Sequence, residues 1–168
     1  MIYRFTDKSL EKRLWEFSGE MIQAQWKKGD PGKTAHELTY QGVRAEYGFL
    51  DILGEPFDWS IKDGGDGGID FTYCGYTHQM KYNNYRPPAG ELYFRNSQPF
   101  VAQVAILSVP LVFGVLGDIE YVGFSTLETF NRYCNPKDWG GRAKPVKSLH
   151  SRYLRDMQDW LDFVYWGK

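Results

Sequence analysis

Cysteine and net charge are both scarce in this sequence. Only Cys74 and Cys134 occur among 168 residues, and 20 basic side chains against 21 acidic ones leave a formal net charge of −1. Two cysteines exclude a disulfide-dense scaffold, and a chain of this length buries enough apolar surface to fold without one. The near-zero charge excludes a bulk attraction to nucleic acid, so any attraction of that kind has to come from local clusters of charge.

Long hydrophobic runs are absent as well. The most apolar stretch, residues 101–116, is interrupted by Gln103, Ser108, Pro110 and Gly114, and it is therefore no transmembrane helix. The N-terminus carries charged residues where a signal peptide has its apolar core. We therefore expect a cytoplasmic, intracellular protein that is neither secreted nor membrane-bound.

The remaining composition is that of one globular domain, with 42% hydrophobic and 24% charged residues and no repeat or long linker. We predict a single domain over 1–168, with a core at about 34–124. An N-terminal helix at 8–27 and a basic C-terminal loop and helix at 131–166 are additions to that core. Asp7 caps the first helix. A second helix is expected to begin at the capping box Thr34–Glu37 and to end at Gly54.

Short apolar segments between turn residues predict the other elements. Strands are expected at 57–61, 69–73 and 76–82, a helix at 97–107, and further strands at 111–116 and 119–124. A capping box at 125–128 predicts a short helix to about 133, and a last helix is expected at 148–166. The resulting order, ααβββαββαα, belongs to the α/β class.

Four polar residues form a constellation that suits metal binding and catalysis: Glu46, Asp70, Gln79 and Lys81. Alternate residues of a strand share a face, so Gln79 and Lys81 point the same way. A tight turn at Cys74-Gly75 brings Asp70 opposite Gln79, where the two side chains are close enough to share one cation. A register shift of one residue would destroy this arrangement.

The two carboxylates of this constellation stand beside apolar positions. Glu46 borders the apolar face of the second predicted helix, and Asp70 begins an apolar strand. Carboxylates in such places are costly to desolvate unless they are paired or bind a metal. Mg²⁺, a hard cation with oxygen ligands, accounts for both. Lys81 would then either orient a metal-bound water or stabilise charge on a phosphorane-like transition state. Ordinary roles, such as an ion pair of Glu46 with Arg44 or a solvated strand end, are the alternatives.

At these residues the sequence resembles the PD-(D/E)XK nuclease superfamily. The resemblance rests on Glu46 in 42–46, on Asp70 in 67–71 and on Gln79-Met80-Lys81. It implies a restriction-endonuclease-like fold, in which helices flank the central mixed sheet of an αβββαβ core. Ile69 stands where the family has proline, and Gln79 where it has an acid. The Gln-x-Lys variant resembles homing-endonuclease and phage branches.

The resemblance also implies roles for these residues. The implied ligands of Mg²⁺, for which Mn²⁺ can substitute, are Asp70, Gln79, the Met80 carbonyl and Glu46. Lys81 would be the catalytic lysine, and the missing negative charge at Gln79 favours one firmly held ion. Glu20 is a competing helix-borne acid, and Asp66 an occasional extra ligand. The histidines and cysteines lack the spacing of a zinc site.

Charge is distributed unevenly along the chain. Residues 36–70 hold eight acids and two bases, a net −6, whereas residues 131–155 hold seven bases and one acid, a net +6. The basic segment suits a phosphate backbone, and the loop at 83–96 offers side chains that read or stack on bases. The nucleic-acid-binding residues that we predict are Asn83, Asn84, Tyr85, Arg86, Arg95, Arg142, Lys144 and Lys147.

The sequence thus predicts a Mg²⁺-dependent endonuclease that hydrolyses phosphodiester bonds of double-stranded or branched DNA. The small size suits a phage or mobile-element enzyme, and cleavage of both strands favours a homodimer. Two alternatives stay open: a non-catalytic nucleic-acid-binding module on the same fold, and a structural or interaction protein that uses its exposed aromatic residues.

Overall fold

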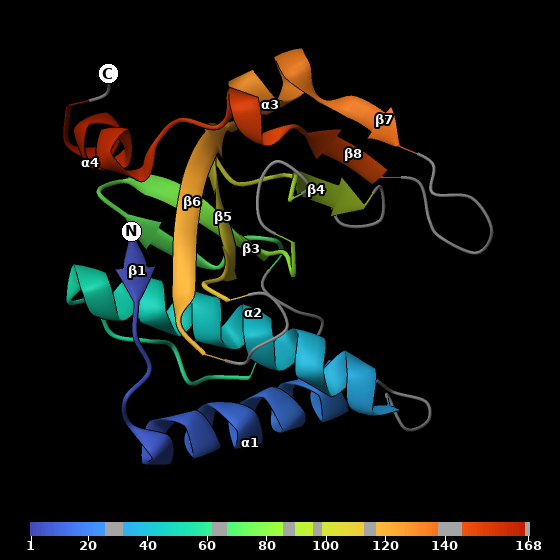
Figure 1. Cartoon of the computed structure of the whole chain (residues 1–168), viewed down its shortest axis with the longest axis vertical. Coiled ribbons are helices and arrows are strands. Elements are labelled where there is room, and N and C mark those ends of the chain that lie inside the picture. Colours follow the sequence, from blue (N-terminus) through green and yellow to red (C-terminus); the bar gives the residue numbers. More distant parts are fainter. Residues whose placement is uncertain are drawn as a thin grey trace.

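The fold is mixed α/β, with a curled sheet between layers of helices (Figure 1). The computed structural model describes residues 1–25, 32–61, 67–85, 90–95, 99–112, 117–137 and 146–166. These residues form the α-helices α1 (Lys8–Gln25), α2 (Gly32–Leu53), α3 (Leu127–Tyr133) and α4 (Met157–Trp166), and a 3₁₀ turn at Ser151–Tyr153.

The main sheet has five strands in the order β1-β6-β5-β3-β2. Its strands are β1 (Ile2–Tyr3), β2 (Phe71–Tyr73), β3 (Tyr76–Tyr82), β5 (Val104–Pro110) and β6 (Ile119–Thr126). β3 and β5 run parallel, and the other neighbours run antiparallel. A second sheet has the order β4-β8-β7, formed by β4 (Leu92–Arg95), β8 (Val146–Leu149) and β7 (Asn135–Lys137).

The core lies on both faces of the main sheet, and β5 shows this most clearly because all of its residues are buried. Val104 and Ile106 pack with residues of α2 and α4, including Phe49 and Trp160. Ala105 and the other alternate residues of β5 pack against the second sheet and α3. The main sheet is therefore covered by α2 and α4 on one face and by the second sheet and α3 on the other, while α1 packs on the outer side of α2 (Figure 1).

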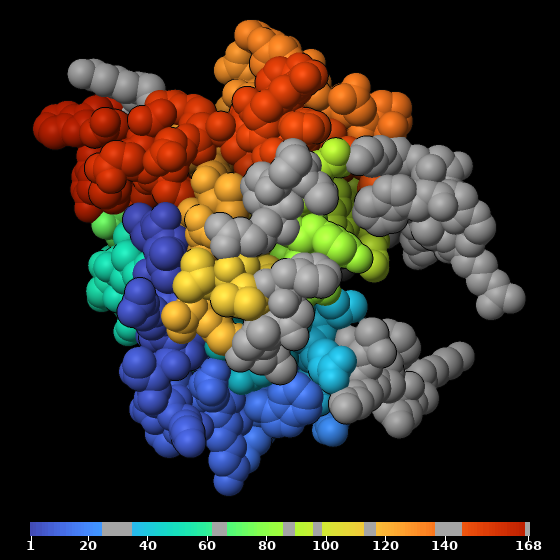
Figure 2. All heavy atoms as spheres, viewed as in Figure 1, coloured from blue at the N-terminus to red at the C-terminus, as the bar shows by residue number. Residues whose placement is uncertain are grey.

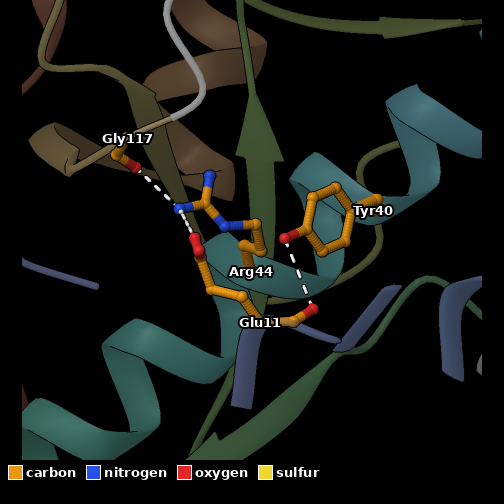
Figure 3. Close-up of polar contacts among 4 residues, drawn as sticks. All are labelled: Glu11, Tyr40, Arg44 and Gly117. Atoms are coloured by element: carbon orange, nitrogen blue, oxygen red, sulfur yellow. Dashed lines mark hydrogen bonds and ion pairs between the residues drawn. The ribbon is translucent and has the colours of Figure 1, made fainter. Parts of the chain in front are cut away.

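One buried cation joins α1, α2 and the residues before β6. Arg44 is 2% exposed, and its Nη2 donates to a carboxylate oxygen of Glu11 at 2.9 Å and to the carbonyl oxygen of Gly117 at 2.8 Å (Figure 3). Its guanidinium also lies over the Phe5 ring, 4.0 Å from the centroid. Removal of Arg44 would leave partners from two distant segments without their donor.

The structure confirms several of the predicted helix boundaries and strands. Asp7 accepts hydrogen bonds from the backbone N–H groups of Ser9 and Leu10 at the start of α1. α2 ends at Leu53 and is followed by Gly54 with φ +71°. The strands predicted at 69–73, 76–82 and 119–124 are present as β2, β3 and β6, and the short helix is present as α3.

Other predicted elements are wrong. Residues 104–107, assigned to a helix at 97–107, belong to β5, so the helix expected within the αβββαβ core is absent from the described residues. No strand forms at 57–61. Of the strand expected at 111–116, residues 111–112 lie beyond the end of β5, and 113–116 lie outside the described residues. α2 begins before the capping box at 34–37, and α3 takes Thr126 as its N-cap. The last helix begins at Met157, because residues 146–149 form β8.

In the part of the chain that the structure describes, no helix combines the length and the apolar character that a bilayer-spanning helix needs.

Candidate functional site

The β2–β3 hairpin has the predicted turn and register. Cys74 and Gly75 have φ values of +48° and +80°, as a two-residue turn of the primed type requires. Tyr73 pairs with Tyr76, and the regular pairing ends with Phe71 opposite His78. Asp70 and Gln79 are therefore the next residues along the two strands, as the sequence predicted.

Asp70 is fixed to β3 by both its backbone and its side chain. Its N–H donates to the carbonyl oxygen of His78 at 2.9 Å, and its Oδ2 accepts a hydrogen bond from the N–H of Met80. The carboxylate thus takes the place of a backbone acceptor at the end of the ladder. Because Met80 lies between Gln79 and Lys81, this bond holds the Asp70 carboxylate beside both residues.

The carbonyl of Met80 faces the same side of β3 as Asp70. A residue in an antiparallel strand presents its N–H and C=O to the same neighbour, and the N–H of Met80 points to Asp70. The side chain of Met80 packs instead into the core, where it is 7% exposed. The backbone oxygen implied as a metal ligand therefore lies along the strand edge that carries the Asp70 carboxylate.

Gln79 has a buried side-chain oxygen that needs a partner. The residue is 4% exposed, and its Oε1 has no hydrogen-bond partner within the described part of the chain. The backbone of Gly68 lies close to the Gln79 side chain, since a Cβ at Gly68 would be 3.4 Å from Nε2 of Gln79 and 3.0 Å from a methyl group of Val101. Gly68 also has a positive φ of +85°, which favours glycine. A buried amide oxygen without a donor costs free energy unless a ligand satisfies it.

Lys81 lines a recess at the C-terminal end of β3. The recess has a volume of about 430 Å³, and Figure 2 shows the hollow between the cyan atoms of α2 and the yellow-green atoms of β4. The half-buried Lys81 places its Nζ 5.1 Å from the ring centroid of Phe94. The recess is lined by Ala35, Leu38, Thr39, Gly42, Met80, Lys81, Tyr82, Asn83, Glu91, Tyr93, Phe94, Arg95 and Leu107.

Glu46 lies on the helix face that covers the hairpin. It is half-buried, one turn after Gly42, which lines the recess, and one turn before Phe49. The ring of Phe49 lies 5.8 Å from that of Phe71, the residue after Asp70. This places Glu46 on the stretch of α2 between the recess and the hairpin, although the described contacts do not join its carboxylate to that of Asp70.

The predicted nucleic-acid residues lie in different surroundings. Asn83 uses its side chain to close its own loop, because its Nδ2 donates to the Glu91 carbonyl oxygen and its Oδ1 accepts from the N–H of Tyr85, both at 3.0 Å. Asn84 and Tyr85 are exposed, Tyr85 by 57%. Arg95 lines the recess and is exposed, and Lys147 is exposed on β8. The predicted residues Arg86, Arg142 and Lys144 lie outside the described residues, as does Asp66.

Part of the basic segment is already engaged with the protein itself. Arg132 pairs with Glu128 at 3.0 Å, and the guanidinium of Arg152 lies 4.7 Å from the Tyr153 ring centroid. The guanidinium of Arg155 lies 5.1 Å from the Phe124 ring centroid. Lys147 and Arg95 are therefore the described basic side chains that best suit contact with a phosphate backbone near the recess.

The donors that the hairpin brings together at Asp70 suit a hard divalent cation. They are one carboxylate, an amide oxygen and a backbone carbonyl, oxygen ligands of the kind that Mg²⁺ prefers, and the structure does not join the Glu46 carboxylate to them. The unsatisfied Oε1 of Gln79 is the observation that fits a ligand there. No group of three or more His, Cys, Asp or Glu side chains that could hold a metal occurs among the described residues.

The sequence did not indicate that Glu91 lines the recess. The start of β4 comes close to α2 in a fold where β4 pairs with β8, more than 50 residues later in the chain. Gly42 carries a signal that could have been used: a glycine inside a helix is unfavourable, and no atom lies within 4 Å of the place its Cβ would take. The glycine keeps that wall of the recess open.

Comparisons with family models, with curated proteins and with solved structures found no match to this chain.

Proposed function

We propose that the protein is a Mg²⁺-dependent endonuclease that hydrolyses phosphodiester bonds in DNA. One observation carries the proposal: the carboxylate of Asp70 is anchored on β3 next to Gln79, whose buried Oε1 has no partner among the described residues, and Lys81 follows in an open recess. The proposal includes membership of the PD-(D/E)XK superfamily and a restriction-endonuclease-like fold for the part built from α2, β2, β3 and β5.

The residues of the hairpin would hold the metal. Asp70, Gln79 and the Met80 carbonyl are the nearest donors, and Glu46 supplies a second carboxylate from α2. A bound Mg²⁺ would polarise the phosphodiester and supply an activated water. The hydrogen bond from Met80 fixes the Asp70 carboxylate before any ligand arrives, which reduces the reorganisation needed on binding.

Lys81 would stabilise the negative charge that develops on the phosphate. Its ammonium group lies 5.1 Å from the ring centroid of Phe94 and Lys81 is half-buried, so the charge is presented to the recess in a partly dry environment. Ammonium groups at such positions interact more strongly with a phosphate than they do in bulk water. Arg95 and Lys147 would hold neighbouring phosphates, and Asn84 and Tyr85 would contact bases.

A DNA-cleavage assay tests the proposal. Supercoiled plasmid and branched DNA are incubated with Mg²⁺ and either the wild type, Asp70→Asn or Lys81→Met. Asparagine keeps an acceptor for the Met80 N–H but loses the charge, and methionine keeps an unbranched side chain without the ammonium group. We expect each variant to reduce the cleavage rate by about 100-fold or more, since the first removes a charge that would hold the metal and the second removes the cation that would face the reacting phosphate.

Two matched variants control for the loss of charge elsewhere. Asp159→Asn removes an exposed carboxylate of α4, and Lys12→Met removes an exposed ammonium of α1. Both should cleave at the wild-type rate. Cleavage at the wild-type rate by Asp70→Asn and Lys81→Met would contradict the site, and so would cleavage that survives chelation of divalent metal.

A non-catalytic nucleic-acid-binding module is the second candidate, because Gln79 lacks the negative charge that the usual acid provides. It predicts DNA affinity that falls steeply with salt, without cleavage and without binding of Mg²⁺ or Mn²⁺. A structural or interaction protein predicts no salt-sensitive DNA affinity at all.

A further inference from the structure

A second cavity lies at the other end of α2 from the recess. Its volume is about 410 Å³, within the range of small-ligand sites. The segment that follows α2 turns back along the helices (Figure 1), and its residues Pro56, Phe57 and Trp59 line the cavity. The cavity is lined by Leu10, Arg13, Tyr47, Asp51, Glu55, Pro56, Phe57 and Trp59. None of these residues belongs to the proposed nuclease site.

Aromatic rings form one wall of this cavity. The rings of Phe57 and Trp59 lie 4.9 Å apart at 72°, and Tyr47 lies 5.6 Å from Phe57 and 6.1 Å from Trp59. Tyr47, Phe57 and Trp59 are each only half-buried. Groups of aromatic faces at such angles are the arrangement that holds organic cations, because each face is negative.

The wall already holds one cation from the chain itself. The Cζ atom of Arg13 lies 3.8 Å from the centroid of the Trp59 ring. A guanidinium is planar and weakly hydrated, so it stacks on an aromatic face more readily than an ammonium does. The cavity volume is the space that remains with Arg13 in place, since Arg13 is one of its walls.

The acidic groups of the cavity exceed this one positive charge. Asp51 and Glu55 supply two carboxylates against the single guanidinium of Arg13, which leaves a net charge of −1. Asp51 accepts a hydrogen bond from the Tyr3 hydroxyl at 2.8 Å, which fixes its position. Burial and the Asp51 charge raise the pKa of Tyr47, and Arg13 opposes this increase. One added monovalent cation would therefore neutralise the cavity.

We propose that this cavity binds the guanidinium group of an arginine side chain from a partner polypeptide. The aromatic wall supplies the stacking surface, the excess carboxylate supplies the charge, and the stacked Arg13 shows that this wall accepts a guanidinium. The inference does not depend on the nuclease proposal, because the two cavities share no residue.

The test is an NMR titration that follows the indole N–H signal of Trp59. The probes are N-acetyl-arginine-N-methylamide, the citrulline analogue of the same shape without charge, and free arginine. We expect the capped arginine to bind at least tenfold more tightly than the citrulline analogue, because a cation–π contact and a charge pair are lost in the latter. Free arginine keeps the guanidinium and the same net charge of +1, so it should also bind more tightly than the citrulline analogue. Equal affinities for capped arginine and citrulline would overturn the proposal.

Variants of charged residues separate this site from general electrostatics. Glu55 is exposed, so Glu55→Gln should leave the fold intact and weaken binding of the capped arginine by about three- to tenfold. Glu20→Gln removes an equally exposed carboxylate about 10 Å further along α1 than Arg13 and should change nothing. Arg13→Gln raises the excess negative charge and should tighten binding. Equal effects of the two Glu variants, or loss of binding in folded Arg13→Gln, would contradict the proposed site.

Discussion

Replacing Gln79 with glutamate adds one negative charge at the centre of the proposed metal site and restores the acid of the family pattern. The amide it replaces is 4% exposed and has an unsatisfied oxygen among the described residues. The new carboxylate would stand beside that of Asp70, which is anchored to Met80. Without a cation, two carboxylates at this position repel each other and are poorly hydrated.

The expected cost without metal follows from this burial. Burial of a carboxyl group raises its pKa by up to about 3 to 5 units, so at pH 7 the free energy of unfolding should fall by about 3 kcal/mol. For a domain of this size each kcal/mol lowers the Tm by roughly 2–4 °C. We therefore expect Gln79→Glu to melt roughly 6–12 °C below the wild type in the presence of EDTA.

Addition of Mg²⁺ should recover most of this loss. A ligand at 100 times its Kd stabilises the folded state by about 2.7 kcal/mol, and the added charge should increase the affinity for the metal. Differential scanning fluorimetry with a Mg²⁺ titration measures the effect. The Tm increase should be clearly larger for Gln79→Glu than for the wild type.

Two further variants complete the experiment. Gln79→Met has no charge and should show no Mg²⁺-dependent recovery. Gln41→Glu places a carboxylate at another side chain whose oxygen is buried without a partner among the described residues, and it too should lack the recovery. A Tm of Gln79→Glu that is equally low with and without Mg²⁺ would refute the metal site.

Three other features give predictions for stability. Burial lowers the pKa of His78 from 6.5 to about 4, so between these pH values the folded state binds fewer protons than the unfolded state. The free energy of unfolding should therefore fall by about 3 kcal/mol from pH 7 to pH 4. Urea unfolding of His78→Phe should lack this contribution to the pH dependence. Arg44→Met should lower the free energy of unfolding by about 2–4 kcal/mol, because its carboxylate and carbonyl partners lose their donor. Arg4 also forms an ion pair, but its side chain is 75% exposed, so Arg4→Met should change the free energy of unfolding by less than about 1 kcal/mol. Gly48→Ala would place a Cβ 2.7 and 2.8 Å from tyrosine side-chain atoms and should lower the free energy of unfolding by about 1–3 kcal/mol. At Gly42 an added Cβ meets no atom within 4 Å, so Gly42→Ala should stabilise α2 by up to about 1 kcal/mol in thermal unfolding. An unchanged pH dependence in His78→Phe, equal losses in the two Arg variants, or equal effects of the two Gly variants would contradict the respective assignments.

Local signals in the sequence were enough to predict the hairpin and the ends of two helices. A two-residue turn needs residues that tolerate a positive φ, and Gly75 at +80° meets this requirement. Asp7 and Gly54 mark helix boundaries for equally local reasons, a side-chain acceptor and a left-handed residue. The position of Asp70 beside Gln79 followed from the same turn, which is why this half of the site could be predicted.

Elements with distant partners could not be predicted in this way. Residues 104–110 are apolar except for Ser108, as suits a strand that is buried on both faces, and a short apolar run does not distinguish such a strand from a buried helix. Residues 146–149 form a strand because β4 and β7 flank them, and neither partner is visible in the local pattern. The same pairing places β4 opposite α2, so the recess around Lys81 depends on contacts that span the chain.

Crystals soaked with Mn²⁺ show whether the hairpin holds a metal, because the anomalous signal of the ion gives its position independently of the protein atoms. We expect one strong peak in direct contact with the Asp70 carboxylate, the Oε1 of Gln79 and the carbonyl oxygen of Met80, with Glu46 bound directly or through water. A hairpin without a peak in crystals that hold Mn²⁺ elsewhere would refute the proposed metal site, as would the same peak in crystals of Asp70→Asn.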